Sequence, residues 1–97
     1  MPTHDQIESF FHDYQKLTDA QKILFRQAIA HFVEDLRGGR FRKGLRVKRM
    51  QGHDGIWEMT WDNDGRATFE YGAPLPDKEG PHIIWRRIGS HSIFNQP

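Results

Sequence analysis

The chain has 97 residues, no cysteine and a formal net charge of +1, from 14 Lys and Arg against 13 Asp and Glu. This length allows one hydrophobic core, so we expect a single domain over residues 1–97, and the lack of cysteine excludes disulfides and thiolate metal sites. No segment approaches the run of about 20 apolar residues that a membrane span needs, and the first residues lack the apolar core of a signal peptide. We therefore expect a soluble cytoplasmic protein with no membrane partner.

Two helices are predicted in the first 40 residues. Thr3 with Gln6 and Thr18 with Gln21 fit the capping box, in which a hydroxyl and an amide satisfy the free donors at a helix start. The Gly-Gly pair at 38–39 predicts the end of the second helix. Each helix carries apolar residues on one face, namely Ile7, Phe10, Phe11, Tyr14 and Leu17 in the first and Phe25, Ile29, Phe32, Val33 and Leu36 in the second.

After residue 44 the apolar residues recur with a period of two, which is typical of β-strands. Asn63-Asp64-Gly65 favours a hairpin, because these residues tolerate the positive φ of tight turns, and the proline-rich segment 73–81 predicts a loop. We expect strands over residues 45–48, 56–61, 66–71 and 82–88. The sequence thus predicts an α+β fold with two N-terminal helices packed on one face of a four-stranded antiparallel sheet, whose other face is concave and open.

Half of the basic residues lie in the segment from Arg37 to Arg49, and no acidic residue occurs between Asp35 and Asp54. Such clustering is typical of a surface that binds phosphate, although a strand with ordinary surface charge is the alternative. By alternation, Arg46 and Lys48 should lie on the open face of the sheet.

Several residues outside this segment are candidates for the same face. Arg66 begins the third predicted strand, and Arg86 and Arg87 are neighbours in the last one, so we expect them to point to opposite faces. One could join the open face, while the other would find an edge or an acidic partner such as Glu58 or Glu70.

Proton transfer near neutral pH is most often performed by histidine, and His91 follows the last predicted strand closely enough to reach the open face. The six histidines of the chain show no metal-ligand spacing, so we expect no metal site. The three tryptophans, Trp57, Trp61 and Trp85, alternate along strands and favour the core over a role in base stacking.

Three segments together resemble the RelE/ParE superfamily, the toxins of bacterial type II toxin–antitoxin modules. They are Gly-Leu-Arg-Val-Lys-Arg-Met (44–50), Gly-Ile-Trp-Glu-Met (55–59) and Trp-Arg-Arg-Ile-Gly-Ser-His-Ser-Ile-Phe (85–94), and the last is similar to the end of YafQ-type toxins. Many members begin with a strand before the first helix. Here Met1–His4 leaves almost no room for one, so we expect a smaller sheet.

The resemblance implies a ribosome-dependent mRNA endoribonuclease that uses no metal or other cofactor and has an antitoxin, the ribosome and mRNA as partners. It implies that Arg87 neutralises charge at the reacting phosphate and that His91 acts as acid or base. The residues implied in RNA binding are Arg46, Lys48, Arg49, Arg66 and Phe94. ParE-type members share the fold and act on gyrase, so a noncatalytic protein of this fold is the alternative.

Overall fold

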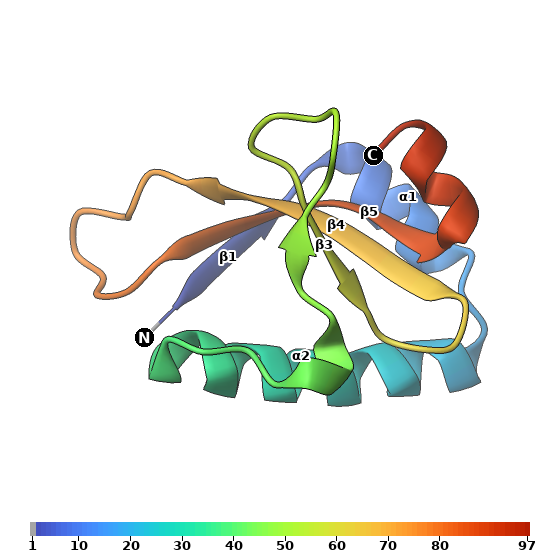
Figure 1. Ribbon diagram of the computed structural model, residues 1–97, viewed down its shortest axis with the longest axis horizontal. Coiled ribbons are helices and arrows are strands. Elements are labelled where there is room, and N and C mark those ends of the chain that lie inside the picture. The colour runs from blue at the N-terminus through green and yellow to red at the C-terminus, as the bar shows by residue number, and fades with distance from the viewer. Residues whose placement is uncertain (1) are drawn as a thin grey trace.

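The computed structural model describes residues 2–97 as a five-stranded mixed sheet with the long helix α2 running across one face (Figure 1). The strands lie in the order β1-β5-β4-β3-β2, with β1 parallel to β5 and every other pair antiparallel. The strands are β1 (Thr3–Gln6), β2 (Lys48–Arg49), β3 (Trp57–Thr60), β4 (Gly65–Gly72) and β5 (His82–Ser90). The helices are α1 (Glu8–Gln15) and α2 (Asp19–Gly38), with short 3₁₀ helices η1 (Lys43–Leu45) and η2 (His91–Asn95).

The predicted α+β class and the two N-terminal helices are confirmed, but the sheet has a fifth strand at its N-terminal edge. Residues 3–6 pair in parallel with residues 82–85 of β5. The Thr3 hydroxyl bonds the His82 Nδ1 atom at 2.8 Å, so it joins two strands and does not cap a helix. Helix α1 begins only at Glu8, and its N-cap Ile7 supplies no side-chain bond. The predictions of a helix start at Thr3 and of a smaller sheet are therefore wrong.

Helix α2 begins and ends where the sequence predicts. The Thr18 hydroxyl accepts from the Gln21 N–H at 3.1 Å, and the Gln21 side chain accepts from the Thr18 N–H at 2.8 Å. Gly39 ends the helix with φ of 81°, which glycine adopts without steric cost. The face toward the sheet carries the buried residues Phe25, Ala28 and Phe32. No helix within residues 2–97 is both long enough and apolar enough to span a membrane.

The first predicted strand is largely replaced by irregular backbone. Leu45 is buried in η1, and Arg46 follows it with φ of 49° and ψ of 44°, the left-handed region. This conformation costs a residue with a side chain about 1–2 kcal/mol. Because the left-handed residue breaks the alternation, Arg46 does not share a strand with Lys48, and β2 contains only two residues. The prediction of a strand over residues 45–48 is wrong for its first three positions.

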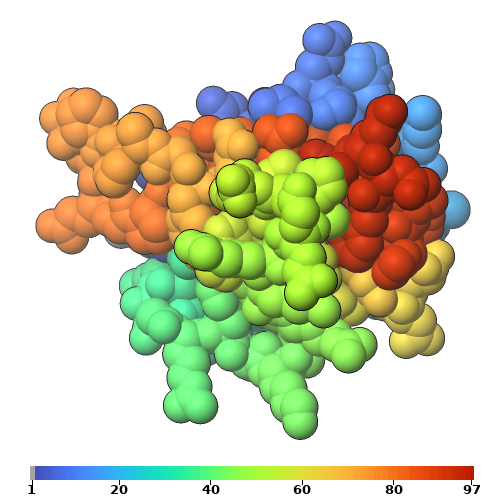
Figure 2. Space-filling view, turned by 45° about the horizontal axis from the view of Figure 1, so that its top comes forward, coloured from blue at the N-terminus to red at the C-terminus, as the bar shows by residue number. Residues whose placement is uncertain are grey.

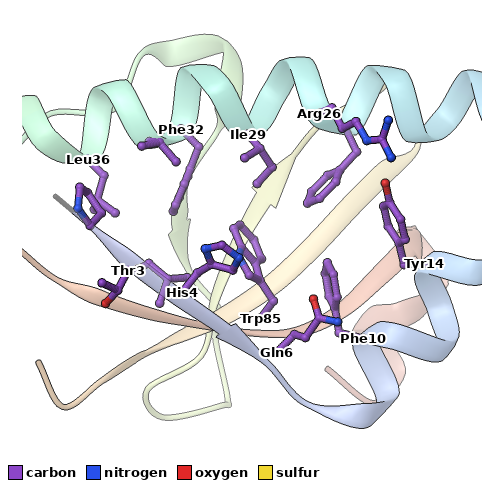
Figure 3. Close-up of a pocket in the computed structure, with 14 residues that line it drawn as sticks. Thr3, His4, Gln6, Phe10, Tyr14, Arg26, Ile29, Phe32, Leu36 and Trp85 are labelled. Carbon is purple, nitrogen blue, oxygen red and sulfur yellow. The ribbon is translucent and has the colours of Figure 1, made fainter. Parts of the chain in front are cut away.

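An apolar cavity of about 260 Å³ opens between β1 and α2 (Figure 3). Its walls include Phe10, Phe32 and Trp85, which belong to the core, and its polar lining includes His4 from β1 and Arg26 from α2. The side of the molecule between β1 and α2 is therefore mainly apolar, in contrast to the charged face of the sheet.

Candidate nucleic-acid interface

A row of four side chains crosses the sheet from β2 to β5. It consists of Lys48, Glu58, Thr68 and Arg87, each directly opposite the next. Residues opposite each other on neighbouring strands point to the same face, and Phe69, which follows Thr68 in β4, packs against α2 on the other face. Neighbouring strands of a sheet lie about 4.8 Å apart, and three such spacings separate β2 from β5. The backbones at Lys48 and Arg87 are therefore about 14 Å apart. Both predicted residues thus lie on the face opposite α2.

Arg87 is held in place by a carboxylate from α1. Its Nε and Nη2 atoms donate to the two carboxylate oxygens of Asp13 at 2.6 and 3.1 Å, and its Nη1 atom donates to the main-chain oxygen of Gln96 at 2.9 Å. Asp13 also accepts from the Ile88 N–H at 3.1 Å. The hydrogen bonds that Arg87 donates to the Asp13 carboxylate raise the pKa of Arg87. The arginine is therefore rigid, and its charge is balanced within the protein.

A β-bulge brings both arginines of β5 to one face. The register between β4 and β5 changes between Thr68 and Phe69, which leaves Arg86 without a residue opposite it. The Arg86 Nη1 atom donates to the Glu70 carboxylate at 3.1 Å, and Glu70 shares the face of Thr68 because the two are two residues apart in β4. The predicted acidic partner Glu70 is confirmed. The prediction that Arg86 and Arg87 point to opposite faces is wrong, because it assumed an unbroken strand.

The face opposite α2 is partly covered by the C-terminal segment and is not the open surface that the sequence predicts. Ile93 of η2 is 5% exposed and packs on Gly89, where an added Cβ would lie 3.0 Å from the Ile93 side chain. Gly89 lies opposite Arg66 and so belongs to this face. Thr68, in the middle of the face, is fully buried. Figure 2 shows the C-terminal residues in red on the same surface as the green residues near position 50.

Two arginines attach the end of this segment to the sheet. Arg87 donates to the main-chain oxygen of Gln96, and the Arg86 Nε atom donates to an oxygen of Pro97 at 3.2 Å. The cationic groups of β5 therefore also hold the segment that carries His91.

His91 is exposed at the first position of η2, directly after β5. Its ring lies edge-on to Phe94, with the ring centroids 4.7 Å apart, and Ser90 caps the turn by accepting from the Ser92 N–H. Within residues 2–97, no hydrogen bond or ion pair occupies the His91 ring nitrogens. The imidazole is therefore available to exchange a proton with a bound molecule.

The other predicted RNA-binding residues have different environments. The Lys48 ammonium lies 3.6 Å from the Glu58 carboxylate, and the Arg49 guanidinium lies over the Trp57 ring at 5.5 Å. The Arg66 Nη1 atom donates to three main-chain oxygens of the β3–β4 turn, at 3.0–3.2 Å. Lys48 belongs to the basic segment that contains no acidic residue, but it has an acidic partner, Glu58, on the neighbouring strand.

The loop after α2 is fixed by Arg42. Its guanidinium donates to both Asp35 carboxylate oxygens at 2.8 Å, and the Arg42 N–H donates to the same carboxylate at 2.9 Å. The side-chain hydrogen bond from Arg42 lowers the pKa of Asp35 from 3.8 to about 2. Arg42 is thus a structural cation within the basic segment.

The Asp35–Arg42 contact gives stability a defined pH dependence. A carboxyl whose pKa is lower in the folded state stabilises the fold above its unfolded pKa and loses this effect as pH falls toward its folded pKa. We expect Asp35→Asn to be less stable than wild type at pH 7, with the difference shrinking between pH 4 and pH 2, the interval between the two pKa values. Urea unfolding of both proteins across this range measures the difference, and a constant difference would contradict the assignment.

Sequence reasoning missed Asp13 as the partner of Arg87 and named Glu58 only as a possible partner of Arg86 or Arg87, not of Lys48. Asp13 lies 74 residues from Arg87 in the chain, and Glu58 contacts Lys48 through pairing of β2 with β3. A weak signal existed for Asp13, since this acidic residue lies between Phe11 and Tyr14, two members of the apolar face of the first helix. Among residues 2–97, no three His, Asp or Glu side chains are grouped where they could hold a metal ion.

The chain has the fold of RelE/ParE toxins. YafQ from E. coli strain BL21(DE3) superposes with a TM-score of 0.69 over 97% of this chain and 98% of that chain, at 11% identity. A chain of the E. coli DinJ–YafQ toxin–antitoxin complex gives a TM-score of 0.68 at 13% identity, covering 94% of this chain and 93% of that chain. A chain of the RelB–RelE antitoxin–toxin complex from Methanococcus jannaschii gives 0.59 at 16% identity, covering 96% and 99%. In sequence comparisons, neither a family model nor a curated protein matches.

Proposed function

We propose that this chain is the toxin of a bacterial type II toxin–antitoxin module and that it cleaves mRNA on the ribosome in the cytoplasm. The likeness of its fold to YafQ and RelE supports the class. The observation that carries the activity is that an exposed His91, beside Phe94, extends from β5 next to the sheet face that bears Lys48 and Arg87.

The proposed reaction requires a proton carrier and a cation beside one phosphate. The 2′-hydroxyl of the RNA attacks the adjacent phosphorus, a 2′-O–P bond forms and the P–O5′ bond breaks, which leaves a cyclic phosphate and a 5′-hydroxyl. His91 accepts the proton of the 2′-hydroxyl or donates one to the leaving oxygen. A guanidinium has five N–H donors, and Arg87 uses three of them within the protein, so two remain for the charge that develops on the phosphate.

In this proposal the exposed cations hold the RNA backbone and Phe94 positions a base. The backbone contacts are assigned to Arg46, Lys48, Arg49 and Arg66. Because the DinJ–YafQ and RelB–RelE structures are toxin–antitoxin complexes, we also propose a cognate antitoxin as partner.

Cleavage of mRNA in a bacterial translation extract tests the proposal. We expect wild type to cut the message and His91→Ala to cut it at least about 100-fold more slowly, the usual contribution of a proton-transfer group. Arg87→Gln should also cut more slowly, and its thermal unfolding must be measured beside it because Arg87 binds Asp13. His12→Ala is the matched control, since His12 is an exposed histidine of α1 paired with Glu8.

One observation favours a noncatalytic protein of this fold, directed at gyrase or acting only as an RNA-binding or protein-binding domain. Asp13 balances the charge of Arg87, which weakens the field that Arg87 can offer to a phosphate. Growth arrest by wild type and by folded His91→Ala alike, with the message uncut in both, would favour this alternative over the endoribonuclease.

A further inference from the structure

Residues 95–97, which we call the strap, follow η2 and lie over the sheet face opposite α2. The first two strap residues are exposed, whereas Pro97 is buried. Gln96 donates its N–H to the Ile93 main-chain oxygen at 3.1 Å, and Pro97 has no N–H to donate. The strap is therefore held on the face by the burial of Pro97 and by its own main-chain oxygens.

Two neighbouring arginines of β5 donate to those oxygens. The Arg87 Nη1 atom donates to the main-chain oxygen of Gln96 at 2.9 Å, and the Arg86 Nε atom donates to an oxygen of Pro97 at 3.2 Å. Each guanidinium also has a carboxylate partner elsewhere in the fold. Because these carboxylates fix the guanidinium groups, the two N–H groups that face the strap keep their direction when it is displaced.

The two guanidinium groups suit an anion better than they suit the strap. A guanidinium binds phosphate strongly, because its charge and its paired N–H donors both match the phosphate oxygens. The strap offers the same donors only main-chain oxygens. The side chains of Arg86 and Arg87 are 29% and 26% exposed, and partial burial strengthens their attraction for an anion. A phosphate can therefore compete with the strap for both arginines.

A buried hydroxyl beside the two arginines has no hydrogen-bond partner. Thr68 lies directly opposite Arg87 and is fully buried, and its Oγ1 atom is without a partner within residues 2–97. Helix η2, from which the strap continues, lies against β4 as well as β5. Nearly all buried polar atoms in folded proteins are hydrogen-bonded. The unpaired hydroxyl therefore points to a partner that binds when the strap is displaced.

The strap can be displaced without moving His91. Ile93 anchors η2 on Gly89, where an added Cβ would lie 3.0 Å from the Ile93 side chain. His91 precedes this anchor and the strap follows it, so rotation of the main chain after residue 94 moves only the strap. The element that ends there is a 3₁₀ helix, whose hydrogen bonds have poorer geometry than those of an α-helix. The end of η2 thus serves as a hinge.

We propose that the strap is autoinhibitory: it occupies a phosphate site formed by Arg86, Arg87 and Thr68, and it must lift before a phosphate binds there. Arg86 and Thr68 have no part in the function proposed above. Lifting the strap frees one N–H of each arginine and exposes the unpaired hydroxyl. The strap and the site rest on these contacts alone, whereas the choice of RNA as the source of the phosphate rests on the proposed function.

Binding of two probes to a strap variant tests the proposal. One probe is a short fluorescent RNA whose 2′-hydroxyls are all methylated, so that the proposed reaction cannot cleave it, and the other is inorganic phosphate. Pro97→Gly removes the buried ring and keeps the main-chain oxygens. We expect it to bind about 5-fold more tightly than wild type, because a larger fraction of the molecules is then open.

Asn95→Ala is the matched control, since Asn95 is an exposed residue of the same strap. It should change binding less than about 2-fold, because it leaves the population of the open form unaltered. An equal gain in Asn95→Ala and Pro97→Gly would overturn the proposal, because the burial of Pro97 would then not be what holds the strap closed.

Two further variants test whether the strap covers these particular groups. Arg86→Gln combined with Glu70→Gln keeps the net charge, and in this background Pro97→Gly should gain less than about 2-fold, because the charged N–H that the strap covers is missing. Thr68→Val in the Pro97→Gly background should weaken binding about 5-fold, the usual size of one hydrogen bond, without lowering the melting temperature. A lower melting temperature with unchanged binding would make Thr68 a structural residue and remove it from the site.

The strap and the endoribonuclease fail in different ways. Equal affinity of Pro97→Gly and wild type for both probes would overturn the strap, whether or not wild type cuts mRNA. If Pro97→Gly binds either probe more tightly while wild type leaves mRNA intact, the strap remains and the endoribonuclease is wrong. A gain for inorganic phosphate alone supports the strap and assigns its site to free phosphate.

Discussion

Phe32→Ala is expected to lower the free energy of unfolding by about 3–5 kcal/mol, the range for removing a large aromatic side chain from a packed core. Phe32 is 1% exposed and is the most buried of the three α2 residues, with Phe25 and Ala28, on the face toward the sheet. Its ring centroid lies 5.2 Å from those of Phe41 and Phe69 and 5.3 Å from that of Trp85. The loss should be large because three rings from three segments would face the space left behind.

Urea unfolding of wild type and variant measures this loss. Phe11→Ala is the control, since Phe11 belongs to α1 and is 48% exposed, and we expect it to cost less than about 1 kcal/mol. A loss in Phe32→Ala no larger than that of the control would show that α2 is not anchored at this residue.

Asp13→Ala is expected to cost about 2–4 kcal/mol, because it leaves a half-buried guanidinium without its partner. The Asp13 side chain is 12% exposed and accepts three hydrogen bonds, two from Arg87 and one from the Ile88 N–H. The residual exposure of Arg87, 26% of its side chain, keeps the cost below that of a fully buried pair. The contact joins α1 to β5, so its loss should loosen the N-terminal helix.

A double-mutant cycle isolates this contact. Asp13→Ala combined with Arg87→Ala should cost less than the sum of the two single changes, because the double variant leaves no unpaired charge. Asp54→Ala, in the exposed loop before β3, serves as control and should change stability by less than about 0.5 kcal/mol. Additive losses in the cycle would mean that Asp13 and Arg87 stabilise the fold independently.

Patterns among neighbouring residues correctly predicted the helices and strands that such short-range patterns define. The Thr18–Gln21 capping box and the glycine at 39 set the bounds of α2, and period-two alternation located β4. The strand expected over residues 82–88, after the proline-rich loop, corresponds to β5. The same capping pattern at Thr3 was misleading, because its hydroxyl bonds His82, 79 residues away. A single left-handed residue, Arg46, shortened the first predicted strand.

The candidate site depends more on long-range geometry. The sequence predicted that Lys48 lies on the open face with one of Arg86 and Arg87, and the register places Lys48 and Arg87 in one row. It did not predict the bulge at Arg86 or the carboxylate of Asp13, because neither leaves a pattern in neighbouring residues. The C-terminal segment covers part of this face because Ile93 packs on Gly89. The period-two pattern of apolar residues in the strands does not indicate this packing.

The parallel pairing of β1 with β5 determines when the sheet can be completed as the chain is synthesised. Residues 3–6 leave the ribosome well before their partners, residues 82–85, so this edge cannot form until β5 has been synthesised. The Asp13–Arg87 contact has the same requirement. Closing such long loops is entropically slow, so β1 and α1 should dock late in folding. A nascent chain therefore lacks both the anchored Arg87 and the His91 that follows it, which keeps the candidate site unassembled during its own translation.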